Sequence, residues 1–270
     1  MTISEEYTNL LFFNNLLKEK NVLHFSTIRS GGVSSGEFES LNMGNYSDDS
    51  SLNIHENRSR VAIQFHIDAS SLITPHQTHS NNVICIDKEF LALSNSEKNE
   101  RLYNNDASVT QEKGFFLCAT TSDCVPILLY DYKNHASAAI HAGWKGTAGL
   151  IVQRTISAMT DNFATNPKDI IASIGPAISI DKYEVGDEVV EQLRATGYPI
   201  TNSVYYINEE SGKAHIDIKE INREALIRIG VPSEQIEKSN LCTYSNKELF
   251  FSARRQSINS GRMLTGIMLT

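Results

Sequence analysis

A cysteine and a histidine at the ends of apolar segments are the residues of this chain best suited to chemistry. Asp123 and Cys124 separate two apolar runs in TTSDCVPILLYD, and His141 follows in AIHAGWKGT. Pro126 opens the second run, so Asp123 and Cys124 are expected in the turn between two strands. Buried thiols are common in protein cores, but a carboxylate beside one is costly to bury unless it is paired. The turn is therefore a candidate site at the rim of a sheet.

A second segment, PHQTHSNN, supplies His76 and His79. Residues three apart in a strand point to opposite faces, so one histidine is expected to face a site and the other to support it. His79, Cys124 and His141 together offer two nitrogen ligands and one sulfur ligand, which leaves a fourth tetrahedral position open, as in catalytic zinc sites. The same set suits blue copper, and Cys124 with His141 alone suits a thiolate–imidazolium pair for covalent catalysis. Sequence spacing does not choose among these alternatives.

Other segments carry groups that suit an anion or a polar substrate. Arg29 precedes two glycines in TIRSGGVSSG, and Arg58 lies in the polar stretch LNMGNYSDDSSLNIHENRSR. Lys145 stands between glycines at the expected start of a helix, where free backbone N–H groups favour an anion, although the same glycines also suit an ordinary tight turn. The substrate- or phosphate-binding candidates are Arg29, Asn42, Arg58, His76, Gln77 and Lys145.

Composition and charge limit the class of protein. Hydrophobic residues make up 40% and charged residues 21% of the chain, as in ordinary soluble globular proteins. The net charge of −8 argues against a nucleic-acid binder, because such proteins normally carry a basic face. No stretch approaches the ~20 apolar residues of a membrane-spanning helix, and the first residues lack the cationic start of a signal peptide. The four cysteines have no CxxC spacing and are interpreted as reduced thiols of a cytoplasmic protein.

The hydrophobic pattern predicts a mixed α+β fold in one domain over residues 1–270. Strands are expected over 21–32, 81–87, 114–121, 125–132, 136–143, 169–175, 203–208, 214–218, 249–255 and 263–269, and helices over 53–67, 146–163, 187–197 and 219–230. The polar run 93–106 is interpreted as a loop. Strands outnumber helices and do not alternate with them regularly, which argues against a doubly wound parallel sheet.

At these residues the chain resembles the laccase-domain, or polyphenol-oxidase-like, family, whose members are regarded as zinc-dependent purine nucleoside phosphorylases with adenosine deaminase activity. The resemblance rests on HFSTIRSGGVS, LNMGNYSDD, NRSR, HQTHS, DASVT, TTSDCVPILLYD, AAIHAGWKGT, IGPAISIDKYEVG and FFSARRQSINSGRM, which follow one another in the expected order over roughly residues 24–263. It implies zinc bound by His79, Cys124 and His141, with Arg58 near the phosphate or sugar. It also implies two packed mixed sheets flanked by helices in α/β/β/α layers, similar to the fold of cysteine-hydrolase toxins. Lys145 stands where an arginine is common, which keeps the charge and loses the bidentate fork.

Four functions are compatible with these residues. The first is phosphorolysis of adenosine, inosine, guanosine or methylthioadenosine by inorganic phosphate, with deamination of adenosine, for which Asp123 is the nearest candidate for proton transfer. The second is amide hydrolysis with Cys124 as nucleophile and His141 as base, which fits the link of some family members to the editing of peptidoglycan precursors. Copper-dependent polyphenol oxidation is disfavoured, because the eight histidines form no H-x-H pair. The fourth is a non-enzymatic binding module; the sequence does not indicate the oligomeric state.

Overall fold

The computed structural model describes residues 1–3, 7, 9–198 and 204–270, and in this part of the chain two six-stranded sheets form the centre of the molecule. The first sheet has the order β1 (Thr2–Ile3), β2 (Leu10–Phe12), β3 (Val22–Thr27), β15 (Met263–Leu269), β7 (Phe116–Thr121) and β4 (Leu72–Ile73). The second has the order β14 (Ile236–Lys238), β10 (Ile170–Ile174), β8 (Val125–Asp131), β9 (Ala136–Ala142), β6 (Ala107–Thr110) and β5 (Val83–Cys85). A small third sheet joins β11 (Glu184–Val185), β13 (Ala214–Ile216) and β12 (Tyr205–Ile207).

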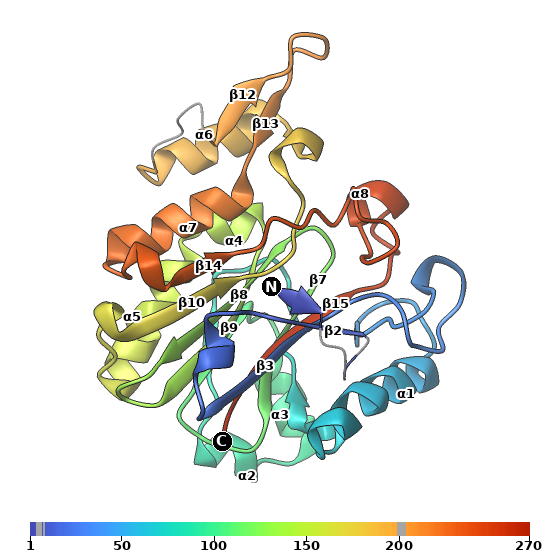
Figure 1. Cartoon of the computed structure of the whole chain (residues 1–270), viewed down its shortest axis with the longest axis vertical. Helices are drawn as coiled ribbons and strands as arrows, with labels where there is room; N and C mark the ends of the chain where they lie inside the picture. The colour runs from blue at the N-terminus through green and yellow to red at the C-terminus, as the bar shows by residue number, and fades with distance from the viewer. Residues whose placement is uncertain (4–6, 8, 199–203) are drawn as a thin grey trace.

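Helices are distributed around these sheets. They are α1 (Ser51–Ala62), α2 (Lys88–Ala92), α3 (Asn95–Leu102), α4 (Trp144–Ala148), α5 (Ile151–Phe163), α6 (Asp187–Ala195), α7 (Ile218–Ile229) and α8 (Ala253–Gln256). Figure 1 shows α5 and α7 beside the second sheet, α1 on the side of the first, and α6 with β12 and β13 projecting at one end. No helix in the described residues is long and apolar enough to cross a membrane.

Alternation along the strands divides the interior into separate hydrophobic clusters. In β8, Ile127 and Leu129 pack with the cluster that includes residues of α5 and α7, whereas Leu128 packs with Leu117 and Ile267 of the first sheet. Successive side chains of a strand point to opposite faces, so β8 contributes to the core between the sheets and to the core under the helices. The opposite face of the first sheet packs against residues of α1 in a third cluster. The two sheets therefore lie face to face, with helices on their outer faces.

The predicted α+β class with two mixed sheets is confirmed, because each sheet has parallel and antiparallel pairs: β4–β7 and β7–β15 in the first, β5–β6 and β8–β9 in the second. The likeness to cysteine-hydrolase toxins and the single-domain prediction stay predictions. The third sheet was not predicted, although two of its strands were; the first residue of the expected strand 203–208 lies outside the described residues.

Three local predictions were wrong. The run 93–106 contains α3, which begins with a capping box in which Ser94 and Glu97 satisfy each other's backbone N–H groups. The expected helix 146–163 is divided into α4 and α5, because Leu150 has a left-handed conformation with φ 62. The segment 249–255 is not a strand: it ends in the short helix α8, which Ser252 caps with its hydroxyl.

Candidate metal centre and adjoining cavity

The predicted metal-binding residues lie at one end of the second sheet, where neighbouring strands begin or end. β5 and β6 are parallel and begin there, β9 is antiparallel to β6 and ends there, and β8 is antiparallel to β9 and begins there. His79 lies in the segment before β5, His141 is near the end of β9, and Cys124 immediately precedes β8. The chain crosses from β7 in the first sheet to β8 in the second at this point, where Asp123 takes a left-handed conformation with φ 84.

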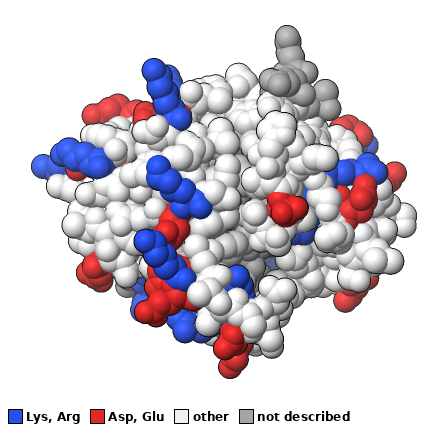
Figure 2. Space-filling view, turned by 90° about the horizontal axis from the view of Figure 1, so that it is seen from below, with Lys and Arg blue, Asp and Glu red and all other residues white. Residues whose placement is uncertain are grey.

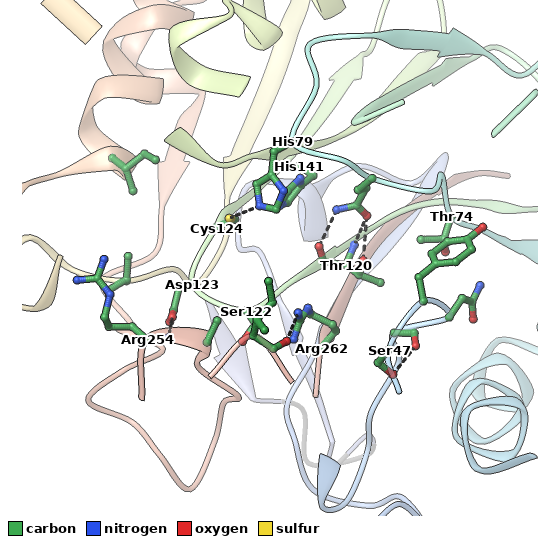
Figure 3. A pocket seen from close by; sticks show the side chains of 18 of the residues that line it. Ser47, Thr74, His79, Thr120, Ser122, Asp123, Cys124, His141, Arg254 and Arg262 are labelled. Carbon is green, nitrogen blue, oxygen red and sulfur yellow. Dashed lines mark hydrogen bonds between the residues drawn. The ribbon is translucent and has the colours of Figure 1, made fainter. Parts of the chain in front are cut away.

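The three side chains converge. One donor atom from each of His79, Cys124 and His141 lies within 4.8 Å of the others, and Sγ of Cys124 is 3.8 Å from Nε2 of His79 (Figure 3). Two tetrahedral zinc ligands, sulfur at about 2.3 Å and nitrogen at about 2.0 Å, are about 3.5 Å apart. The predicted convergence is therefore confirmed and the donor set fits one ion, whereas ligation itself stays a prediction.

Asp106 holds two of these residues in place, the His141 side chain and the His79 backbone, and sequence reasoning did not single it out. Its carboxylate is buried, and Oδ1 accepts from Nδ1 of His141 at 2.7 Å and from the backbone N–H of His79 at 3.1 Å. Oδ2 accepts from the N–H groups of Thr78 and Ser80 at 3.1 and 2.7 Å, and from the Ser80 hydroxyl at 2.7 Å. Because Nδ1 of His141 faces a carboxylate, it carries the proton and Nε2 is left as the ligand atom in the neutral ring.

Electrostatics around Cys124 favour the thiolate. Burial raises the pKa of the Cys124 thiol, but His141 and His79 outweigh burial through charge and hydrogen bonding and lower this pKa to about 6. Burial lowers the pKa of His141, but the Cys124 thiolate and Asp106 outweigh it and raise this pKa to about 9. The metal-free protein therefore holds a thiolate beside an imidazolium, and a thiolate is the form of cysteine that binds metals or acts as a nucleophile.

A cavity of about 430 Å³ opens beside the three candidate ligands. Gly143, directly after β9, leaves room for them, since a Cβ there would lie 2.9 Å from Cδ2 of His79 and 3.0 Å from Sγ of Cys124. The lining also includes the apolar side chains of Ile178 and Ile218. A concave cavity that combines apolar surface with convergent polar groups is typical of small-molecule sites.

Of the six predicted substrate-binding residues, only Gln77 lines this cavity. Its amide nitrogen donates to the backbone carbonyl of Thr120 at 2.8 Å, and its amide oxygen accepts from the N–H of Thr120 at 2.8 Å and from its hydroxyl at 2.9 Å. Gln77 therefore fixes the end of β7 at the cavity wall.

The remaining predicted cations lie elsewhere. The guanidinium of Arg29 donates to the backbone carbonyls of Glu39 and Lys247 and lies over the Phe251 ring. The ammonium of Lys145 is exposed and lies 5.7 Å from the centre of the Trp144 indole.

The other three predicted residues lie behind the wall of the metal cavity: Arg58, Asn42 and His76. Arg58 is buried beside a neighbouring cavity, and its guanidinium donates to two backbone carbonyls and to the Thr74 hydroxyl. Asn42 is also buried and accepts from the backbone N–H of Arg262 at 2.9 Å. The His76 ring stacks on Tyr46, a wall residue, with 3.7 Å between ring centres. These three residues support the cavity wall and do not line it.

Asp123 lines the cavity, but its carboxylate is already engaged. Oδ1 accepts from the Thr243 hydroxyl at 2.6 Å, and Oδ2 accepts from the Ser252 hydroxyl at 2.9 Å and from the backbone N–H of Arg254 at 2.7 Å. These bonds join the β7–β8 crossing to the segment that carries α8. The predicted role of Asp123 in proton transfer stays a prediction, and the structure shows a carboxylate that three hydrogen bonds hold in place.

Two arginines of the cavity were also missed by sequence reasoning. Arg254 and Arg262 come from FFSARRQSINSGRM, and they line the cavity together with Tyr183 from IGPAISIDKYEVG. Both segments belong to the pieces that resemble the family and so carry a signal for a site, but the strand predicted over 249–255 gives no indication that these arginines face a cavity. Figure 3 shows both arginines farther along the cavity from the two histidines.

The fold and the site define a laccase-domain protein, and the comparisons agree. The family described as multi-copper polyphenol oxidoreductase laccase matches residues 23–270, and the chain belongs to this family. It is 41% identical over 260 residues to a purine nucleoside phosphorylase of Bacteroides thetaiotaomicron, with 96% of each chain covered. It is 40% identical to adenosine deaminase RL5 from an unknown prokaryotic organism, covering 90% of this chain and 92% of the relative. The crystal structure of the hypothetical protein YfiH of Bacillus licheniformis superposes with a TM-score of 0.89 at 31% identity, with 97% of each chain covered.

Proposed function

We propose that this protein is a zinc-dependent purine nucleoside phosphorylase that also deaminates adenosine. The observation that carries the proposal is the convergence of His79, Cys124 and His141 at the wall of a cavity of about 430 Å³. The names of the two relatives supply the reaction classes, phosphorolysis of purine nucleosides and deamination of adenosine. Adenosine, inosine, guanosine and methylthioadenosine are the proposed nucleosides.

The donor set supports zinc over copper. Two imidazole nitrogens and one thiolate with an open fourth position match catalytic zinc sites. Blue-copper sites add a weak axial ligand, commonly methionine, and no methionine lines the cavity in the described residues. Asp106 would orient His141 and fix its tautomer, as carboxylates do behind metal-bound histidines.

A bound zinc ion would supply a Lewis acid that polarises a substrate oxygen or lowers the pKa of a water molecule. In phosphorolysis, a phosphate oxygen forms a bond to the anomeric carbon and the bond from that carbon to the base nitrogen breaks. The base leaves with the electron pair and takes a proton, which gives free base and sugar 1-phosphate. The protein's own contribution is to hold the two substrates in line and to exclude water from the cavity.

Deamination requires addition of water at the amino-bearing carbon of adenine, followed by loss of ammonia, so a group must move protons. We keep Asp123 as the candidate, because it is the one carboxylate that lines the cavity among the described residues. Its three hydrogen bonds leave one of the roughly four lone-pair sites of the carboxylate unused, at Oδ1, which within the described residues accepts only from the Thr243 hydroxyl and can take the proton.

Incubation of the purified protein with adenosine tests both activities. Chromatography with phosphate present is expected to show adenine and hypoxanthine as free bases, and without phosphate to show inosine. Elemental analysis of protein purified without added metal is expected to find about one zinc per chain, and a C124S variant is expected to lose it. Equal zinc in both proteins, or no product with any of the four nucleosides, would rule the proposal out.

Amide hydrolysis is the second candidate, and one observation favours it. Asp106, His141 and Cys124 form a carboxylate–imidazole–thiolate series like that of cysteine hydrolases, in which the carboxylate orients the base. Editing of peptidoglycan precursors would be a matching role. Iodoacetamide separates the candidates: a free nucleophile is alkylated in the protein as purified, whereas a zinc-bound thiolate reacts only after chelation.

A further inference from the structure

Phosphorolysis requires an inorganic phosphate dianion next to the nucleoside, and the protein as a whole does not attract anions. Its net charge is −8, and acidic and basic side chains are interspersed on the face drawn in Figure 2. Local cations must therefore bind the phosphate. The three cations that the sequence suggested, Arg29, Arg58 and Lys145, do not line the metal cavity.

Arg254 lines the cavity and keeps some of its guanidinium N–H donors free of acceptors among the described residues. Its Nη1 donates to the backbone carbonyl of Glu184 at 2.8 Å, and the guanidinium lies 5.3 Å from the centre of the Tyr183 ring. Within the described residues, Nε and Nη2 have no acceptor and the side chain forms no ion pair with a carboxylate. The Tyr183 ring and the Glu184 carbonyl orient a cation that keeps free N–H groups.

Arg262 is a second cation without a carboxylate partner among the described residues, and it is held rigidly. Its Nη2 donates to the carbonyl of Ile258 at 2.9 Å, and Nη1 donates to the Ser260 hydroxyl at 3.0 Å and the Gly261 carbonyl at 3.1 Å. These neutral acceptors fix the guanidinium without cancelling its charge.

The carboxylate oxygens of Asp123 accept no hydrogen bond from the guanidinium of either arginine in the described residues. Both oxygens already accept from hydroxyl or backbone donors, and the one contact with Arg254 is to its backbone N–H. The hydroxyl of Ser122, which also lines the cavity, is 3.1 Å from that of Ser260 and adds a neutral hydrogen-bonding group. This part of the cavity therefore combines the two arginines with neutral hydroxyls and the single carboxylate of Asp123, which leaves an excess of positive charge that suits a phosphate dianion.

We propose that Arg254 and Arg262 form the phosphate subsite of this cavity, with Arg254 as the residue whose free N–H groups contact the phosphate oxygens. The proposal rests on the proposed phosphorylase function. It assigns phosphate binding to α8 and the segment that follows it up to β15, and takes that role away from Arg29, Arg58 and Lys145.

Steady-state phosphorolysis of inosine by the zinc-loaded R254Q variant tests the assignment. Removing a charged donor that contacts phosphate is expected to raise the KM for phosphate about 10- to 100-fold, with a smaller change in the KM for inosine. R254K is expected to recover part of the loss, because it restores the charge without the planar fork. R29Q is the matched control: it also removes a guanidinium that holds backbone carbonyls, but outside the cavity, and both KM values should stay within twofold.

Phosphate binding at equilibrium gives a second readout that does not depend on turnover. Titration with inorganic phosphate is expected to raise the Tm of the wild-type and R29Q proteins, and to raise that of R254Q only at much higher phosphate concentrations. A phosphate KM and a Tm response of R254Q within twofold of the wild type would overturn the subsite, and so would a larger effect from R29Q. If the wild type shows no phosphorolysis but its phosphate-dependent Tm shift is lost in R254Q, the proposed function fails while the anion subsite stands.

Discussion

Replacing Asp106 by asparagine is the most direct perturbation of the candidate metal centre that leaves its three candidate ligands intact. The carboxylate accepts five hydrogen bonds, two at Oδ1 and three at Oδ2. In D106N one of these oxygens becomes an NH2 group, which cannot accept. If the NH2 group replaces Oδ1, it faces the N–H of His79 and Nδ1 of His141, which are also donors. If it replaces Oδ2, it faces the N–H groups of Thr78 and Ser80.

Either orientation leaves at least two donors of partly buried hydrogen bonds without their acceptor. At about 0.5–1.5 kcal/mol for each, D106N should lose about 1–3 kcal/mol of unfolding free energy. For a chain of this size that loss lowers the Tm by at least about 2 °C. His141 also loses the carboxylate that fixes its tautomer, so zinc affinity should fall about 10- to 100-fold.

A chromophoric zinc chelator in competition measures the affinity, and thermal denaturation with and without zinc measures stability. D131N is the matched control: Asp131 is also a buried acceptor, binding the backbone N–H groups of Lys133 and Asn134, but it lies at the opposite end of β8. It should lower stability and leave zinc affinity unchanged. The reasoning is refuted if D106N binds zinc as tightly as the wild type, or if D131N loses zinc to the same extent.

Other outcomes follow from the same geometry. G143A should lower zinc affinity about tenfold or more while leaving every donor in place, because its Cβ would meet the His79 ring and the Cys124 sulfur; chelator competition checks this. In chelated protein, the rate of alkylation of Cys124 should rise as the pH increases through about 6, and added zinc should suppress it; a midpoint near 9 would contradict the assigned surroundings. The thiolate's contribution to stability is lost as the pH falls through about 6, since its folded pKa is lowered, and that of the His141 imidazolium is lost as the pH rises through about 9, since its folded pKa is raised. The ion pair therefore persists in metal-free protein between about pH 6 and 9. Because the folded and unfolded states each bind about one proton on these two groups over most of this window, the free energy of unfolding should change little across it, which denaturation at several pH values checks.

The amino-acid sequence by itself indicated the three candidate metal ligands and the local setting of two of them, Cys124 and His141. Pro126 and the apolar runs around Asp123 and Cys124 marked a turn between strands, and the alternation from Ala136 to His141 marked the next strand. Such signals are local, and the hairpin pairing of β8 with β9 brings His141 beside the start of β8. The convergence of His79 with these two was a hypothesis from residue types, one of several that spacing left open, and the resemblance to the family favoured it.

Tertiary structure alone decided what surrounds those ligands. Asp106 reaches the site because β6 lies between β5 and β9, an order that no local pattern encodes. Arg254 and Arg262 enter the cavity because the segment before β15 is tied to Asp123, whereas Arg29 and Arg58 are bound by backbone carbonyls elsewhere. An arginine binds whichever acceptors the fold brings within reach, and those acceptors are often far away in sequence. Residue types and local periodicity therefore indicate the reactive groups, while the packing of non-consecutive strands selects their partners.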